Sequence, residues 1–169
     1  MTNANGTRPT LGRMETTDIL KVLPHRYPFL LVDRIIDMDG DSSATGIKNV
    51  TMNEPYFQGS FPSNPVMPTT LLLEGLAQTA GALCMHHLKV NEPPLIYFMS
   101  IDKARLRRSV RPGDTVHYLV EKIRSRGWVW RYRGRAVVDG TLVARAEFSA
   151  AIVEAGSPPE MPGHNPGAC

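Results

Sequence analysis

The sequence predicts an α+β fold in which an antiparallel sheet wraps around one long central helix. Two observations support this prediction: residues 68–88 form a helix-length, mostly apolar segment without an internal proline, and four strand-like stretches follow it. Two further strand-like stretches precede the helix. One buried helix between an opening hairpin and a series of antiparallel strands makes an α+β layer, and wrapping the sheet around the helix buries it most economically.

The elements before the long helix are short. Residues 17–22 predict a helix that ends before Pro24, and residues 29–37 and 43–52 predict two strands, because they are apolar or alternating. The sequence DMDGDSS between the two strands is rich in turn-forming residues and predicts a hairpin.

Pro68 suits the first position of the long helix, which is apolar nearly all round and is therefore expected inside the protein or at an interface. The turns RPGD, SRG and VDG separate the strands expected after it. This arrangement predicts a hot dog fold. The four expected strands are residues 95–106, 114–124, 128–139 and 142–154.

The chain has 169 residues, of which 42% are hydrophobic and 21% charged, as is ordinary for one globular domain. Residues 1–16 and 156–169 are rich in small polar residues, Pro and Gly, so we expect both ends to be disordered around a hot dog domain at 17–155. No segment suits a membrane span or a signal peptide, and we expect a cytoplasmic protein without a membrane partner. Cys84 and Cys169 indicate neither a disulfide nor a metal site.

The net charge is +3, and basic residues concentrate between Lys103 and Arg111 and between Arg124 and Arg135. Such segments favour an acidic partner. No nucleic-acid-binding motif accompanies them, so we expect no nucleic-acid partner.

Four stretches, in the same order and at the same intervals, resemble the type II hydroxyacyl-carrier-protein dehydratases of bacterial fatty acid synthesis. The resemblance implies a hot dog fold, a substrate attached to acyl carrier protein through phosphopantetheine, and no cofactor or metal. The stretches are LPHRYPFLLVDRI (23–35), NVTMNEPYFQGSFPSNPVMP (49–68), LLLEGLAQTAG (71–81) and IDKARLRRSVRPGD (101–114).

The loop before the long helix departs from this family. The family's loop reads Gln-Gly-His-Phe-Pro-Gly-His-Pro-Val-Met-Pro-Gly, and its first histidine takes the α-proton of the substrate. This chain has Ser60 at that position, and it also has Ser63, Asn64 and Thr69 where the family has glycine, histidine and glycine. A serine without a neighbouring base cannot take that proton, so we expect Ser60 to be inactive. A nucleophilic serine is the weaker alternative, because no histidine and acid accompany it.

The family's second catalytic group is an acid on the central helix, contributed across the dimer interface, and it corresponds to Glu74. A structural alternative is that Glu74 lies on a polar stripe with Thr70 and Gln78, which are four residues away on either side. The apolar surroundings favour a functional role, because a buried carboxyl group needs a partner or a task. His25 could also act as a base, but the family carries it beside its loop histidine, and we expect a structural role.

Other residues are expected to contact the substrate or its carrier. Lys103, Arg105, Arg107, Arg108 and Arg111 resemble the basic residues that meet the carrier in this family, although a solvated strand face would show the same alternation. By resemblance, the expected substrate-binding residues are Gly59, Phe61, Thr69 and Gln78. The aromatic residues Tyr56, Tyr97 and Phe98 could line an acyl tunnel, but aromatic residues on strands more often belong to the core.

Three functions are compatible with this sequence. The leading one is a subunit of a heteromeric 3-hydroxyacyl-carrier-protein dehydratase in fatty acid or polyene-type polyketide biosynthesis, in which Glu74 completes a site whose histidine comes from a homologous partner. The second is a non-catalytic protein that binds acyl carriers or lipids. The third is a homodimeric enoyl-thioester isomerase that uses Glu74 as its base.

Overall fold

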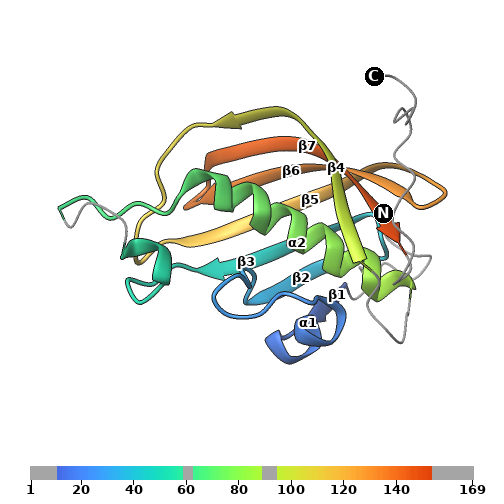
Figure 1. Cartoon of the computed structure of the whole chain (residues 1–169), viewed down its shortest axis with the longest axis horizontal. Helices are drawn as coiled ribbons and strands as arrows, with labels where there is room; N and C mark the ends of the chain where they lie inside the picture. The colour runs from blue at the N-terminus through green and yellow to red at the C-terminus, as the bar shows by residue number, and fades with distance from the viewer. Residues whose placement is uncertain (1–10, 59–62, 89–94, 154–169) are drawn as a thin grey trace, which may run out of the picture.

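The computed structural model describes residues 11–58, 63–88 and 95–153. Seven antiparallel strands form one sheet in the order β1-β2-β3-β5-β6-β7-β4, and this sheet curves around the long helix α2 (Figure 1). No helix in the described residues is long and apolar enough to span a membrane. In chain order the elements are β1 (Gly12–Met14), α1 (Thr16–Val22), β2 (Arg34–Asp39), β3 (Ser43–Asn49), the 3-10 helix η1 (Pro55–Phe57), α2 (Thr69–Leu88), β4 (Leu95–Leu106), β5 (Thr115–Arg126), β6 (Val129–Val138) and β7 (Thr141–Val153).

Helix α2 packs closely against the concave face of the sheet. A Cβ atom at Gly75 would lie 2.3 Å from Cζ of Tyr118 on β5, and a Cβ atom at Gly46 on β3 would lie 2.2 Å from Oγ1 of Thr79. Glycine at these two positions therefore allows the helix and the strands to approach each other. The central part of α2 is buried, including residues 78–85 without a break, as the apolar sequence predicts.

The N-terminal region differs from the expectation in two places. Residues 12–14 were expected to be disordered, but they form β1 on the edge of the sheet, paired with β2, and Met14 is buried. The ordered domain thus begins before residue 17. The first long strand starts at Arg34 instead of residue 29, because the backbone of Phe29 and Leu31 bonds to a side chain of α2 instead of to a neighbouring strand.

The strands that follow α2 do not all pair in chain order. Among the described residues, β4 pairs only with β7 and forms the other edge of the sheet. β5 pairs with β3 and so joins the two halves of the chain. In β6 and β7, buried residues alternate with residues that are partly or fully exposed. One side of these strands therefore faces α2, and the other faces solvent.

Candidate functional site

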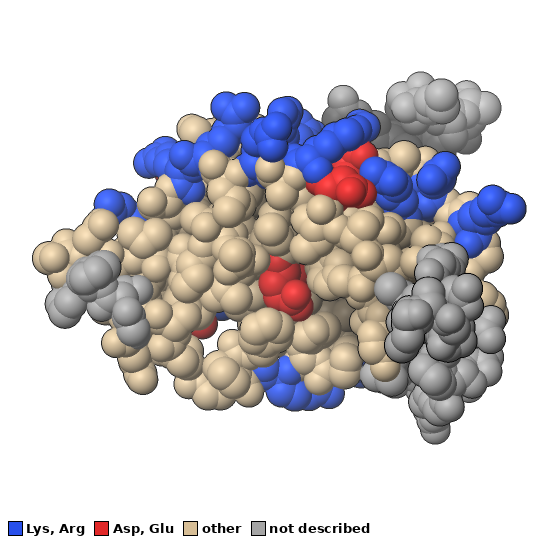
Figure 2. Space-filling model, turned by 45° about the horizontal axis from the view of Figure 1, so that its top comes forward, with Lys and Arg blue, Asp and Glu red and all other residues tan. Residues whose placement is uncertain are grey.

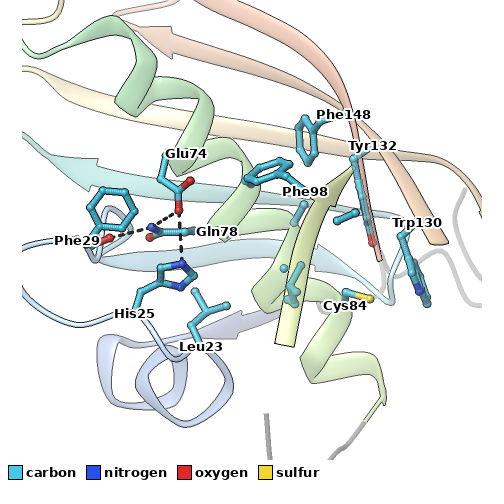
Figure 3. A pocket seen from close by; sticks show the side chains of 15 residues that line it. Leu23, His25, Phe29, Glu74, Gln78, Cys84, Phe98, Trp130, Tyr132 and Phe148 are labelled. Atoms are coloured by element: carbon cyan, nitrogen blue, oxygen red, sulfur yellow. Dashed lines mark hydrogen bonds and ion pairs between the residues drawn. The ribbon is translucent and has the colours of Figure 1, made fainter. Parts of the chain in front are cut away.

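A pocket of about 240 Å³ lies between α2, the inner face of β4, β6 and β7, and the segment after α1. Its polar end holds Glu74, Gln78 and His25, and most of the remaining wall is apolar (Figure 3). A mainly apolar pocket with a few converging polar groups is typical of a small-molecule site. The apolar wall consists of Leu23, Phe29, Ala77, Ala80, Gly81, Cys84, Ile96, Phe98, Trp130, Tyr132, Phe148 and Ala150.

Glu74 lies in the second turn of α2, and its side chain is 21% exposed. Oε1 accepts a hydrogen bond of 2.8 Å from Nε2 of Gln78, and Nε2 of His25 lies 3.5 Å from the same oxygen. Oε2 has no protein partner among the described residues, so one carboxyl oxygen is anchored and the other is free to exchange a proton with a ligand. Glu74 therefore has polar partners from two segments and not only from its own helix.

Gln78 is 2% exposed and connects α2 to the segment before β2. Besides its bond to Glu74, Nε2 donates to the carbonyl of Phe29 at 2.8 Å, and Oε1 accepts from the backbone N–H of Leu31 at 2.8 Å. Both N–H groups of the amide are thus used within the protein. Gln78 lines the pocket, but its amide is arranged to hold Glu74 more than to bind a substrate.

The structure brings His25 to the pocket. Its ring stacks on Phe29 with centroids 6.3 Å apart, and Nε2 faces Glu74 (Figure 3). Nδ1 is buried and has no hydrogen-bond partner in the part of the chain that the structure describes. The motif LPHRYPF made His25 a candidate residue. Its contact with Glu74, however, joins positions 49 residues apart in sequence, so the motif alone could not predict that contact.

Four aromatic side chains continue along one wall of the pocket. Phe98 meets Phe148 edge to face at 6.0 Å, Phe148 stacks with Tyr132 at 6.3 Å, and Tyr132 stacks with Trp130 at 6.5 Å. Phe98 therefore lines the pocket. Tyr56 instead packs against the core beside Phe57. A wall of this kind suits an acyl chain, because it offers apolar area along its whole length.

Cys84 also lines the pocket, but its thiol is not activated as a nucleophile. Burial raises the pKa of its thiol to about 12, so the thiol stays protonated near neutral pH. Within the ranges that the structure covers, no three His, Cys, Asp or Glu side chains come together in a way that could hold a metal ion.

The loop before α2 is only partly described. Gly59, Ser60 and Phe61 lie outside the described residues, and Thr69 is the first residue of α2 and is not among the pocket-lining residues. The described part of the loop is anchored by Lys48, whose side chain is 7% exposed and forms ion pairs with Glu54 and Asp33. Sequence analysis missed this buried lysine, because nothing local distinguishes it from an exposed strand residue.

The five basic residues expected to meet a carrier are all exposed, but they do not share one strand. Lys103 and Arg105 lie on β4, whereas Arg107, Arg108 and Arg111 follow its end. The interpretation of all five as one alternating strand face is therefore wrong. The loop after β4 is tied to the segment before α2, because the carbonyl of Val110 accepts a hydrogen bond of 2.8 Å from the backbone N–H of Met67.

An antiparallel sheet wrapped around one buried helix, with a pocket between them, defines this chain as a hot dog protein. Comparison with known proteins narrows the class, because a model of the FabA-like domain matches residues 23–147. A 3-hydroxyacyl-(acyl-carrier-protein) dehydratase FabZ of Allorhizobium ampelinum is 57% identical over 143 residues, which cover 85% of this chain and 92% of that protein. The chain therefore belongs to the FabA-like family, among relatives named as FabZ dehydratases.

Other relatives and solved structures agree with this assignment. A FabZ of Methylobacterium sp. strain 4-46 is 55% identical over 153 residues and covers 88% of this chain and 93% of its own. The dehydratase heterocomplex ApeI:P from Xenorhabdus doucetiae superposes with a TM-score of 0.70 at 15% identity, covering 81% of this chain and 91% of that one. The E. coli PaaI protein gives a TM-score of 0.53 at 15% identity, covering 70% and 78%. At such identities the solved structures support the fold alone.

Proposed function

We propose that this chain is a subunit of a dehydratase that acts on carrier-bound 3-hydroxyacyl thioesters in fatty acid or polyene-type polyketide biosynthesis. It supplies Glu74 to a site whose histidine comes from a homologous partner. The observation that carries the proposal is the carboxyl group of Glu74, anchored by Gln78 at the polar end of an apolar pocket. The high identity to FabZ relatives supports the reaction class.

The proposed chemistry divides between two groups. A base removes the proton from Cα of the substrate, and the electron pair of that C–H bond forms the double bond to Cβ as the C–O bond at Cβ breaks. Glu74 donates a proton to the departing hydroxyl group, which leaves as water. The base is the missing part here, because Ser60 has no basic group to accept the α-proton.

A partner supplies the base in this proposal. In a two-fold dimer whose sites each combine a base from one chain with an acid from the other, pairing with a histidine-bearing homologue leaves one complete site. The second site combines Ser60 with the partner's acid and is inactive. In this second site, Thr69 and backbone groups at Gly59 and Phe61, which belong to the same loop as Ser60, contact the thioester.

The acyl carrier protein is the second proposed partner. Lys103 and Arg105 on the edge strand and the three arginines after it are exposed, and the loop after β4 is hydrogen-bonded to the segment that enters α2. An acidic carrier bound there would present its phosphopantetheine near the start of α2. Electrostatic attraction of this kind raises the rate of association.

A complementation assay tests the shared site. The nearest histidine-bearing homologue from the same genome is changed so that its own helix acid is glutamine, which inactivates its homodimer. Co-expression with this chain is expected to restore dehydration of a 3-hydroxydecanoyl carrier protein, followed as loss of water by mass spectrometry. Complexes with Glu74→Gln are expected to lose about 10²–10⁴-fold in rate, as is typical when a positioned acid or base is removed.

Two controls complete the assay. This chain alone is expected to be inactive, and Ser60→His in this chain is expected to give the lone protein measurable dehydration by providing the missing base. If the unmodified lone chain dehydrates at the rate of the complex, the proposed role of the partner is wrong. If no combination dehydrates the substrate while acyl carrier still binds, the chain is a carrier-binding protein without this activity.

The contact between His25 and Glu74 favours one other function, an enoyl-thioester isomerase formed by this chain alone. Glu74 would take a proton from Cγ of a 2-enoyl thioester and return it to Cα, which moves the double bond without releasing a hydroxyl group. His25, whose Nε2 lies 3.5 Å from the same carboxyl group, would hold that group in position. Conversion of a trans-2-decenoyl thioester to the 3-decenoyl isomer by the lone chain would support this function over the leading one.

A further inference from the structure

The pocket has two ends of different character. Glu74 and His25 form the polar end, whereas Trp130, Tyr132 and Cys84 lie at the opposite end (Figure 3). Trp130 is 9% exposed and Tyr132 is 3% exposed, and their rings stack with centroids 6.5 Å apart. The two aromatic rings are thus nearly inaccessible to solvent. We call this part of the pocket the closed end.

A lysine contacts the closed end from outside the pocket. Figure 2 shows Lys and Arg side chains gathered on the surface along one side of the molecule, where such residues are ordinarily found. Lys122 differs from them, because it lies on the side of β5 that carries the buried Val116, Tyr118 and Val120. Its side chain is 22% exposed, and its Nζ lies over the ring of Trp130, 5.3 Å from the centroid. A cation in this place is attracted by the π electrons of the indole ring.

Asp41, in the turn between β2 and β3, pairs with this lysine. Its carboxylate accepts a hydrogen bond from Nζ of Lys122, and its backbone carbonyl accepts one of 3.3 Å from the hydroxyl of Tyr132. Nε2 of His87, in the last turn of α2, lies 3.9 Å from the same carboxylate. Burial raises the pKa of Asp41, but the hydrogen bond and the charge of Lys122 outweigh burial and leave the pKa below its ordinary value. Both aromatic residues of the closed end are therefore held by one ion pair.

The distance between the two ends limits what the pocket can hold. The α2 residues that line it recur every three or four positions from Glu74 to Cys84, so the pocket runs along the helix. This part of α2 is about 15 Å long. An extended chain of single bonds advances about 1.2 Å per bond, as an extended backbone does, so about 15 Å holds roughly twelve carbons beyond the carbon beside Glu74.

The fold alone does not account for the ion pair. Taking two charges out of water costs hydration, and replacing such a pair by apolar side chains of similar volume is often neutral or stabilising. We propose that the pair of Asp41 and Lys122 holds Trp130 and Tyr132 across the closed end, and that the pocket therefore accepts acyl chains of up to about 14 carbons. This inference rests on the proposed function, because it assigns the chain length that the same pocket takes.

Isothermal titration calorimetry tests the proposal with the full chain and saturated acyl pantetheine thioesters of 8 to 18 carbons. For the wild type, each added two-carbon unit is expected to tighten binding about tenfold up to 14 carbons, because each buries further apolar area. The thioesters of 16 and 18 carbons are expected to bind no more tightly, because they must displace Trp130. Trp130→Leu is expected to extend the tightening to 18 carbons. Trp128→Leu is the matched control, because Trp128 is 63% exposed at the tip of the same hairpin, and it is expected to keep the wild-type limit.

A double variant tests the ion pair separately from the aromatic ring. Asp41→Asn with Lys122→Met removes the pair without leaving an uncompensated charge, and it is expected to bind the 16-carbon thioester at least tenfold more tightly than the wild type. The control is Glu121→Gln with Arg135→Met, which removes an ion pair of 3.4 Å between the exposed faces of β5 and β6 and is expected to leave the limit unchanged. Thermal unfolding checks that each variant is folded, and the double variant decides alone if Trp130→Leu does not fold.

Three results would overturn the proposal. The first is a wild-type affinity that continues to rise up to 18 carbons. The second is a folded Trp130→Leu or a folded double variant that keeps the wild-type limit. The third is the absence of binding at every chain length. Binding requires no catalytic base, so a limit at 14 carbons in a protein that fails the complementation assay would support this inference and contradict only the proposed dehydration.

Discussion

Gln78 and Glu74 lie one turn apart on α2, and Nε2 of Gln78 donates a 2.8 Å hydrogen bond to Oε1 of Glu74. The same amide also bonds to the backbone of Phe29 and Leu31. The acid of the candidate site is therefore fixed by a residue that also holds the chain segment before β2. Position of the carboxyl group and stability of the fold depend on one buried side chain.

Gln78→Leu is expected to reduce both stability and activity. It leaves the buried N–H of Leu31 and the carbonyl of Phe29 without their partner, which lowers the free energy of unfolding by about 1–3 kcal/mol for each group left unsatisfied. Urea unfolding measures this loss, and the complementation assay measures the accompanying fall in rate. Thr79→Val is the matched control, because it removes only a bond to the carbonyl of Gly75 on the same helix. An unchanged midpoint for Gln78→Leu would contradict this account.

Gly75→Ala is expected to destabilise the protein although alanine favours helices. The new Cβ would lie 2.3 Å from Cζ of Tyr118, which is fully buried and cannot move aside. Such overpacking costs about 1–3 kcal/mol, more than the gain of about 1 kcal/mol in helix propensity. Gly134→Ala is the comparison, because its Cβ would meet Cδ2 of Leu76 at 2.9 Å, the flexible end of a side chain. Thermal unfolding should show a lower Tm for Gly75→Ala than for Gly134→Ala.

Much of the fold could be predicted from local sequence. The bounds of β4 agree with the prediction, those of α2 differ by one residue at Pro68, and the hairpin of β2 and β3 was expected. The pairing of β4 with β7 could not be predicted, because each strand has an ordinary alternating pattern that several neighbours would satisfy. β1 was not predicted, because three residues at a sheet edge are too few to show an alternation of apolar and polar side chains.

The site was predicted less completely than the fold. Glu74 was predicted as a site residue because a carboxyl side chain is unusual on an apolar helix, and because the family resemblance gave it a role. The roles of Gln78 and His25 depend on contacts across 47–49 residues of sequence, which no local pattern encodes.

Cys84 is expected to react slowly with thiol reagents in the folded protein. Its pKa of about 12 leaves the thiol almost fully protonated at pH 8, so the thiolate fraction falls by roughly a thousandfold relative to an exposed cysteine of pKa about 8.5. The rate with Ellman's reagent, measured in a Cys169→Ser background, should rise to that of a free thiol when the protein is unfolded in urea. Fast reaction of the folded protein at pH 8 would show that the pocket exposes this thiol.

His25→Leu is expected to separate the two candidate activities. The leading function needs Glu74 chiefly as an acid held by Gln78, and the 3.5 Å contact with His25 is longer than an ordinary hydrogen bond, so dehydration by the complex should fall only about tenfold, or about 1.4 kcal/mol. Isomerisation by the lone chain needs Glu74 to be held against Cγ and then Cα by its contact with His25, and it should be abolished. His117→Gln on β5 is the control, because Val116 and Tyr118 beside it are buried and His117 therefore faces away from α2. Loss of dehydration as large as that of Glu74→Gln would instead make His25 the base of the site, because a supporting contact alone would not have so large an effect.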